Sequence, residues 1–212
     1  MSYQLQGIFP TPIQQGNIGR PFTKEELEFV EHWGKEGNTY NNQGNITSLN
    51  KYVLDDPTLK DIREFAQKAI DNFVATVYIP KKPVQLAITQ SWLNYTREGQ
   101  YHHTHEHPNS FLSGVFYFDA DFETDKIFFH KKGYQQIKLP TETFQLYNSD
   151  SWFFQVKTGD IMMFPSSLTH NVETKKGENR RVSLAFNTFP VGYIGEEESL
   201  TALHTSNPLR PN

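Results

Sequence analysis

From Val84 onward, the chain consists of short runs in which apolar, aromatic and β-branched residues recur with a period of two. The runs are VQLAITQSWLNY, SGVFYF, KIFFH, FQLYN, WFFQV, DIMMF and RVSLAFN, and Gly, Pro, Asn or Asp separates most of them. Successive side chains of a strand point to opposite faces, so short runs at regular spacing indicate a sandwich or a barrel. We therefore predict a mainly β fold, a double-sheeted jelly roll.

Two helices are predicted ahead of these strands. Thr23 to Glu26 form a capping box, and Gly34 can end the helix that follows. For the second helix, Asp56 is the cap and Pro57 occupies the first helical position, and apolar residues then recur at helical spacing as far as Val77. Both helices are expected to pack on one sheet.

The length of the chain suits a single domain of residues 1–212. We divide it into a helical N-terminal part (1–80), a jelly-roll core (84–190) and an extended C-terminal arm (191–212).

Composition narrows the partners that this domain can have. The net charge is −4 and neither sign forms a long run, which argues against a binder of nucleic acid or membrane surfaces. The chain has no Cys, so any metal must be held by nitrogen and oxygen. Because no signal peptide or membrane-spanning stretch is evident, the cytoplasm is the expected location, and a homodimer is left open.

Four of the eight histidines lie within six residues, in the stretch YHHTHEHPNS. On a strand, His103, His105 and His107 would share one face, while His102 and Glu106 would point to the other. Two imidazoles at this spacing can converge on one metal. A solvated polar loop is the alternative, because a short His-rich run is only a compositional signal.

A further histidine favours the metal site. In TGDIMMFPSSLTHNV, DIMMF is a strand between two turns and His170 begins the next strand. Such a hairpin would bring His170 opposite the HxH strand, across the mouth of a barrel. Three nitrogens would then hold a metal and leave coordination positions free for water or substrate.

The strand RVSLAFN offers a site for an anion. Arg181, Ser183 and Ala185 share one face of this strand, and an Arg fork beside a hydroxyl suits bidentate binding of a carboxylate. Arg180, at the exposed start of the strand, is expected to be solvated.

Together these motifs resemble the 2-oxoglutarate/Fe(II)-dependent dioxygenase superfamily, and within it a family of oxygenases with HxHPNS, SGVxY and RxSxAFN motifs. The matching segments here are HEHPNS (105–110), SGVFY (113–117), RVSLAFN (181–187) and the early IFPTPI (8–13). The similarity spans most of the chain and is weakest in the C-terminal arm.

This resemblance implies a double-stranded β-helix that binds Fe(II) and 2-oxoglutarate. By analogy, His105 and His170 bind iron, and Arg181 with Ser183 binds the distal carboxylate of the cosubstrate. Asn94 and Tyr117 are further candidates for contact with 2-oxoglutarate. The implied reaction consumes O2, releases succinate and CO2, and hydroxylates an unidentified substrate.

One departure from the superfamily pattern concerns the third metal ligand. Most members carry H-x-Asp or H-x-Glu, whereas no carboxylate stands two residues after His103 or His105. The third ligand is then His107 or an acidic residue elsewhere, such as Asp160. Since Asp160 follows Gly159 as a turn residue, we predict His107.

Two other classes of protein are kept as alternatives. A metal-dependent cupin without 2-oxoglutarate would share the HxH and the downstream histidine, but it has no need of R-x-S. A non-enzymatic jelly-roll binding module would explain the aromatic content but not the histidines and Arg181 together. Trp92 is expected to pack in the core, and the segments 38–50 and 120–150 are expected to select the substrate, with four aromatic residues available to line a pocket. These are Phe122, Phe144, Tyr147 and Trp152.

Overall fold

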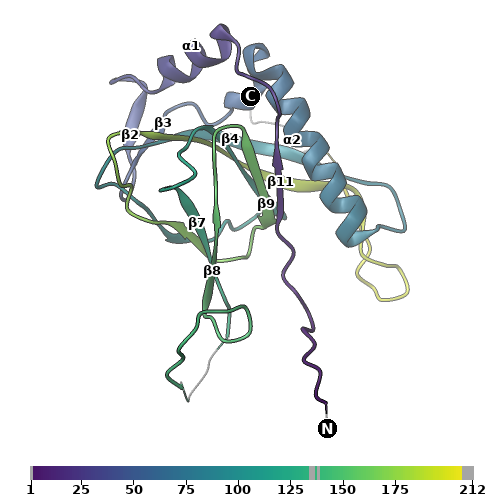
Figure 1. Ribbon diagram of the computed structural model, residues 1–212. Coiled ribbons are helices and arrows are strands. Elements are labelled where there is room, and N and C mark those ends of the chain that lie inside the picture. The colour runs from purple at the N-terminus through teal and green to yellow at the C-terminus, as the bar shows by residue number, and fades with distance from the viewer. Residues whose placement is uncertain (1, 134–136, 138, 207–212) are drawn as a thin grey trace.

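Most of the period-two runs form strands of two antiparallel sheets (Figure 1). A layer of buried side chains lies between these sheets. The computed structural model describes residues 2–133, 137 and 139–206. The strands of the larger sheet are β1 (Gln14–Asn17), β2 (Thr39–Asn41), β3 (Ile46–Ser48), β4 (Val84–Thr96), β6 (Leu112–Asp119), β9 (Asp160–Pro165), β11 (Arg181–Ile194) and β12 (Leu203–Thr205). Those of the smaller sheet are β5 (His102–His105), β7 (Lys126–His130), β8 (Ser151–Gln155) and β10 (His170–Val172).

The order of these strands confirms the predicted jelly-roll class. Within the described residues, the larger sheet runs β1-β9-β6-β11-β4-β3-β2, with β12 paired to β11, and the smaller sheet runs β5-β10-β7-β8. Strands from the first 50 residues thus form both ends of the larger sheet, so the N-terminal part contributes strands as well as helices.

The helices begin where the sequence predicts. Helix α1 (Lys24–Trp33) has the Thr23–Glu26 capping box and ends at Gly34. The second predicted helix has three parts, which are a 3-10 turn η2 (Pro57–Leu59) capped by Asp56, helix α2 (Lys60–Phe73) and a π-helical turn η3 (Val74–Tyr78). A further 3-10 turn, η1 (Val53–Asp55), precedes them.

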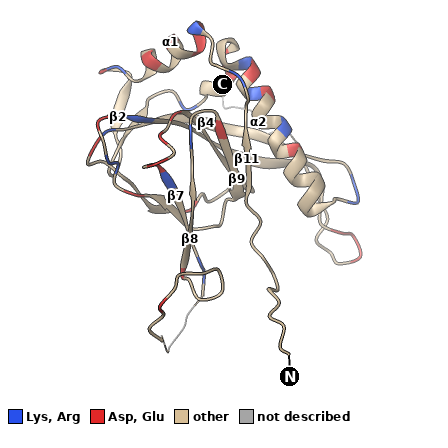
Figure 2. Cartoon of the chain, viewed as in Figure 1, with Lys and Arg blue, Asp and Glu red and all other residues tan. Residues whose placement is uncertain are grey.

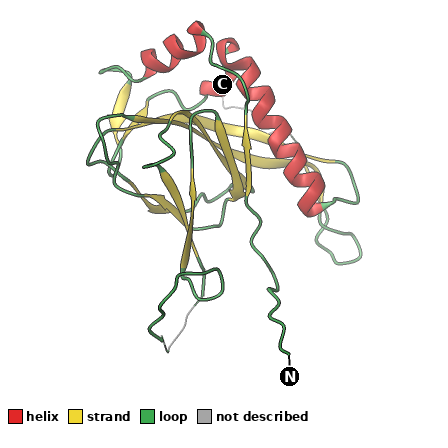
Figure 3. Ribbon diagram, in the orientation of Figure 1, coloured by secondary structure: helices red, strands yellow, loops and turns green. Residues whose placement is uncertain are grey.

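Both helices cover the outer face of the larger sheet (Figure 3). Helix α2 buries one apolar face against β4, β6 and β9, and charged residues mark its outward side (Figure 2). The buried residues are Ile62, Ala66, Ala69, Ile70 and Phe73. This spacing is the helical period that the sequence shows. None of the helices in the described part of the chain has the length and apolar run needed to cross a membrane.

The central strands are apolar on both faces because each face has its own core. Along β9, Ile161 and Met163 join the helix-side core, while Met162 and Phe164 join a second core between the sheets. Phe164 meets Phe129 of the smaller sheet there, with ring centroids 5.0 Å apart. The sheet therefore separates a helix-packing layer from the interior that holds the candidate site.

Two predicted strand features are wrong. FQLYN (144–148) is a turn, because the side chain of Asn148 accepts a hydrogen bond from the Gln145 amide at 3.0 Å and donates one to the Thr143 carbonyl at 2.8 Å. Such local bonds compete with strand pairing. The predicted hairpin between DIMMF and His170 also fails, since β9 and β10 belong to different sheets and the chain crosses between them.

The C-terminal segment is more ordered than the predicted arm. Strand β11 continues to Ile194, and β12 returns antiparallel to it, with Tyr193 opposite His204. Thr205 fastens this hairpin by donating to the Pro190 carbonyl at 2.7 Å. The last part of the predicted arm, residues 207–212, lies outside the described residues.

Candidate metal centre

Three histidines converge at one edge of the smaller sheet. His105 ends β5, His170 begins β10, and the two residues are directly paired between antiparallel strands. His107 lies two residues beyond β5, where its amide donates to the Ser166 carbonyl at 3.0 Å. One ring nitrogen from each histidine lies within 4.8 Å of the other two, a separation from which one metal ion can be bound.

The backbone fixes which ring nitrogen faces the centre. Nδ1 of His105 donates to the His103 carbonyl at 2.7 Å, and Nδ1 of His170 donates to the Leu168 carbonyl at 2.9 Å. These bonds leave Nε2 of both rings as the nitrogen that can bind a metal, an arrangement common to metal-binding histidines. The donor set thus fits a divalent transition metal such as Fe(II).

Burial favours the neutral form of these rings. Burial, followed by the neighbouring histidines, lowers the pKa of His170 to about 3 and that of His107 to about 4. Burial also lowers the pKa of His105. A neutral imidazole is the form that binds metal, so the site needs no proton removed near neutral pH.

The predicted alternation of histidines along β5 is wrong. His170 pairs with His105 but Val172 pairs with His102, so three residues of β10 oppose four of β5. This irregularity turns His102 into the same pocket as His105, and the two rings stack with centroids 4.6 Å apart. His103 does not line the pocket, and its Nδ1 instead lies 3.3 Å from the Gln43 carbonyl oxygen.

Neither acidic candidate joins the three histidines. Glu106 is exposed, where it accepts from the Thr169 hydroxyl at 2.5 Å and pairs with Lys132 at 3.0 Å. Asp160 is buried in its turn, where it accepts from the side chain of Asn17 at 2.7 Å and from the amide of Lys157 at 3.0 Å. Among the described residues, the cluster around His170 contains imidazole only.

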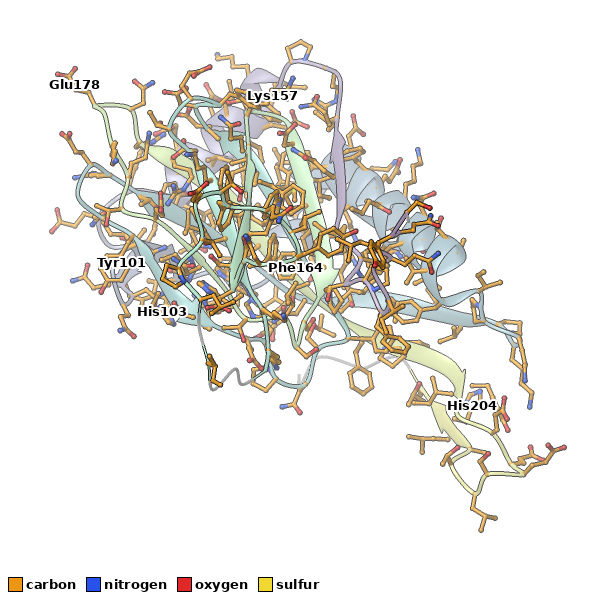
Figure 4. The ribbon with its side chains drawn as sticks, turned by 60° about the horizontal axis from the view of Figure 1, so that its bottom comes forward. Tyr101, His103, Lys157, Phe164, Glu178 and His204 are labelled. Atoms are coloured by element: carbon orange, nitrogen blue, oxygen red, sulfur yellow. The ribbon has the colours of Figure 1, made fainter. Side chains whose placement is uncertain are left out.

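The predicted anion-binding residues lie in the same pocket as the three histidines. Strand β11 brings Arg181, Ser183 and Ala185 to the pocket, while Val182 and Leu184 enter the helix-side core, as the alternation predicts. Figure 4 shows Phe164, another lining residue, among the interior side chains, and His103 nearer the edge. The other predicted cosubstrate residues, Asn94 and Tyr117, also line this pocket.

The polar ends of the pocket residues differ in what they can still bind. Oδ1 of Asn94 accepts from the Thr47 hydroxyl at 3.0 Å, so its NH2 group is the end that can donate to a ligand. The Tyr117 hydroxyl is fully buried and has no hydrogen-bond partner in the described part of the chain. Since burial raises the pKa of Tyr117, this hydroxyl stays protonated and can donate.

Arg181 is a cation that lines the pocket, and one of its two terminal nitrogens has a hydrogen-bond partner. Nη1 donates to Oδ1 of Asp125 at 2.9 Å, and both side chains are buried. Nη2 is buried with no partner within the described ranges. Sequence reasoning missed Asp125, because its stretch FETDK carries no signal other than that of a polar turn.

Two aromatic predictions are corrected by the pocket. Trp92 lines the pocket rather than packing only in the core, and its ring centroid lies 5.9 Å from that of His107. Phe144 stacks on Trp152 with centroids 5.0 Å apart, and neither residue lines the pocket, nor do Phe122 and Tyr147.

Fold and site together define a jelly-roll protein with a candidate metal centre between its sheets. A family model described as "Putative 2OG-Fe(II) oxygenase" matches residues 90–187, which include the three histidines and Arg181. No curated protein sequence matches the chain significantly.

Solved structures share the fold at low sequence identity. A 2OG-Fe(II) oxygenase family oxidoreductase from Burkholderia pseudomallei has a TM-score of 0.55 at 12% identity, with 83% of each chain covered. HygX from Streptomyces hygroscopicus, with nickel, 2-oxoglutarate and hygromycin B bound, has a TM-score of 0.52 at 13% identity, covering 84% of this chain and 82% of HygX. A Pseudomonas putida prolyl-4-hydroxylase has a TM-score of 0.55 at 10% identity, covering 84% of this chain and 92% of the hydroxylase.

The family match and the fold confirm the resemblance seen in the sequence. Residues 90–187 thus match a family of 2-oxoglutarate/Fe(II)-dependent oxygenases, a class whose cofactors are Fe(II) and 2-oxoglutarate, and the solved structures show the same fold.

Proposed function

We propose that the chain is a 2-oxoglutarate-dependent oxygenase in which His105, His107 and His170 bind Fe(II). Arg181 and Ser183 bind the distal carboxylate of 2-oxoglutarate. The observation that carries this proposal is that Nη2 of Arg181 has no partner among the described residues, in a pocket that three histidines also line. A buried donor without a partner is costly, and a bound carboxylate would remove that cost.

Each pocket residue has a defined task in this proposal. Iron held by the three histidines would supply the oxygen chemistry, in which O2 and 2-oxoglutarate give succinate and CO2, with one oxygen atom of O2 in succinate and the other in the hydroxylated substrate. Arg181 and Tyr117 donate to the distal carboxylate, and Asn94 offers its NH2 group to the keto-acid end. The aromatic walls exclude water from the pocket.

The three-imidazole ligand set affects the metal. Three neutral ligands leave the ion with more positive charge than two histidines and a carboxylate do, which strengthens its attraction for the anionic keto-acid end of 2-oxoglutarate. A cytoplasmic location stays a prediction from the sequence, which leaves a homodimer open and does not identify the substrate.

A turnover assay with metal analysis tests the proposal. The iron-loaded protein should consume O2 and 2-oxoglutarate and release succinate, slowly without its substrate. Iron-loaded protein that neither binds nor turns over 2-oxoglutarate would favour a cupin-type enzyme. Protein that takes up no metal would favour a binding module.

A further inference from the structure

Asp125 holds Arg181 from outside the pocket. Its Oδ1 accepts from Nη1 of Arg181 at 2.9 Å, and the two side chains are 1% and 4% exposed. Asp125 is itself fixed by Asp121, whose amide donates to Oδ2 of Asp125 at 2.8 Å and whose carbonyl accepts from the Asp125 amide at 2.8 Å. The turn 121–125 thus sets the position of the Arg181 anchor.

This anchor determines what the rest of the guanidinium can do. The group is planar and rigid, so a fixed Nη1 also fixes the direction of Nη2. Nη2 finds no acceptor among the residues that the structure describes, although Arg181 lines the pocket. Asp125 therefore uses one arm of the fork and leaves the other for a ligand.

Lys175 is a second buried cation beside Asp125. Its Nζ is 3.5 Å from the same Oδ1, and its side chain is 1% exposed. Nζ also donates to the Thr124 hydroxyl at 3.1 Å and to the Lys176 carbonyl at 2.9 Å. Lys175 is not a lining residue of the pocket.

The charges in direct contact within this buried group do not balance, and Asp119, a further carboxylate near Lys175, is exposed. Arg181 and Lys175 are two cations, and Asp125 is the one anion that contacts them within the described residues. A buried charge is costly unless it is paired. Arg181 places the excess positive charge at the pocket, so one anionic ligand bound there would neutralise it.

We infer that Asp125 and Lys175 are positioning residues for Arg181. Asp125 aims the guanidinium, and Lys175 offsets the charge of Asp125 so that Arg181 keeps its attraction for a carboxylate. This inference rests on the proposed function, in which that carboxylate is the distal end of 2-oxoglutarate.

Calorimetric titration of the Ni(II)-loaded protein with 2-oxoglutarate and with pyruvate tests the inference. Pyruvate carries the same keto-acid end without the distal carboxylate. Lys175→Met should weaken 2-oxoglutarate binding at least about tenfold, because Asp125 then cancels the charge of Arg181. Pyruvate affinity should not change, and Lys176→Met, at an exposed neighbour, should leave both affinities unchanged.

A double variant separates positioning from simple structural support. Asp125→Asn combined with Lys175→Met keeps an oxygen for Nη1 and restores the excess charge, so the affinity for 2-oxoglutarate should recover to within about threefold of the original. The double variant is used instead of Asp125→Ala, because Asp125→Ala would leave two buried cations without their carboxylate and would destabilise the fold. A merely structural role predicts no such recovery.

Two sets of results would overturn the inference. Suppose that Arg181→Ala abolished 2-oxoglutarate binding while Lys175→Met left that binding unchanged, or weakened pyruvate binding as much as 2-oxoglutarate binding. Asp125 and Lys175 would then have no positioning role. If the original protein bound 2-oxoglutarate no better than pyruvate, or Arg181→Ala changed nothing, the proposed function would fail and this inference with it.

Discussion

His105 and His170 lie directly opposite each other on strands β5 and β10, and their ring centroids are 4.3 Å apart. In each case, Nδ1 is held by a carbonyl two residues earlier in the chain. The same local bond on two facing strands therefore orients both rings before any metal binds. Such preorganisation lowers the entropy cost of metal binding.

Replacing one of these two rings should empty the metal site. His170→Ala should reduce bound metal from about one equivalent to a trace, because two ligands bind far more weakly than three. Some stability should also be lost, because His170 is buried with its centroid 4.6 Å from that of Phe164. Elemental analysis with circular dichroism checks both effects. His204→Ala, on the β11–β12 hairpin, should bind metal normally.

The neighbours Glu106 and His107 test which side chain is the third ligand. His107→Ala should weaken metal affinity by at least about tenfold, whereas Glu106→Ala should not change it. The reason is that Glu106 bonds to Thr169 and Lys132 at the surface. Competition with a chromophoric chelator measures both affinities. Weaker binding in Glu106→Ala alone would assign a carboxylate ligand instead.

Gly114 is required by the close packing of β6 on β11. A Cβ at this position would lie 2.1 Å from Cζ of Phe186, a buried ring in the helix-side core. Gly114→Ala should therefore lower the free energy of unfolding by about 1–3 kcal/mol, the usual range for an overpacked core. Urea denaturation measures the loss. Gly16→Ala, whose Cβ would lie 3.4 Å from Ile161, should cost clearly less.

Glu26 should contribute stability that depends on pH. Burial by itself raises the pKa of Glu26, but the Arg20 guanidinium and the Thr23 amide outweigh it, so the pKa is lowered overall. A lowered folded-state pKa stabilises the protein above the unfolded-state value of about 4.3, and this stability is lost as pH falls through the folded-state pKa. Glu26→Gln should thus be destabilised at pH 7.

The comparison between pH 7 and pH 3 is the test for Glu26. In urea denaturation, the difference between the original protein and Glu26→Gln should be clear at pH 7 and shrink at pH 3. Glu28→Gln is the control, because Glu28 pairs with Lys24 at the surface, where such pairs contribute little. An equal difference at both pH values would contradict the prediction.

Local sequence rules predicted the parts of the fold that short-range physics determines. The capping box at Thr23 and the alternation along RVSLAFN both hold, because each depends on neighbours in sequence. His105, His107 and His170 lie together in one pocket.

The errors arise where pairing partners distant in sequence decide the structure. The irregular pairing of β5 with β10, which turns His102 into the pocket, depends on register between strands and leaves no trace in HHTH itself. Asp125 and Lys175 were missed for the same reason. Asp125 pairs with Arg181, and Lys175 pairs with Asp125 from a separate loop, and buried ion pairs have no periodic signature in the sequence.

The most direct test of the account is the binding of 2-oxoglutarate to two adjacent arginine variants. Titration of the Ni(II)-loaded protein should show that Arg181→Ala loses binding by at least about a hundredfold, because the buried carboxylate loses its cation. Arg181→Lys should restore only part of the 2-oxoglutarate affinity, since an ammonium lacks the planar, two-pronged geometry of a guanidinium. Arg180→Ala should bind normally, because Arg180 pairs with Glu31 outside the pocket. Equal behaviour of the two alanine variants, or greater damage in Arg180→Ala, would contradict the assignment of this pocket to 2-oxoglutarate.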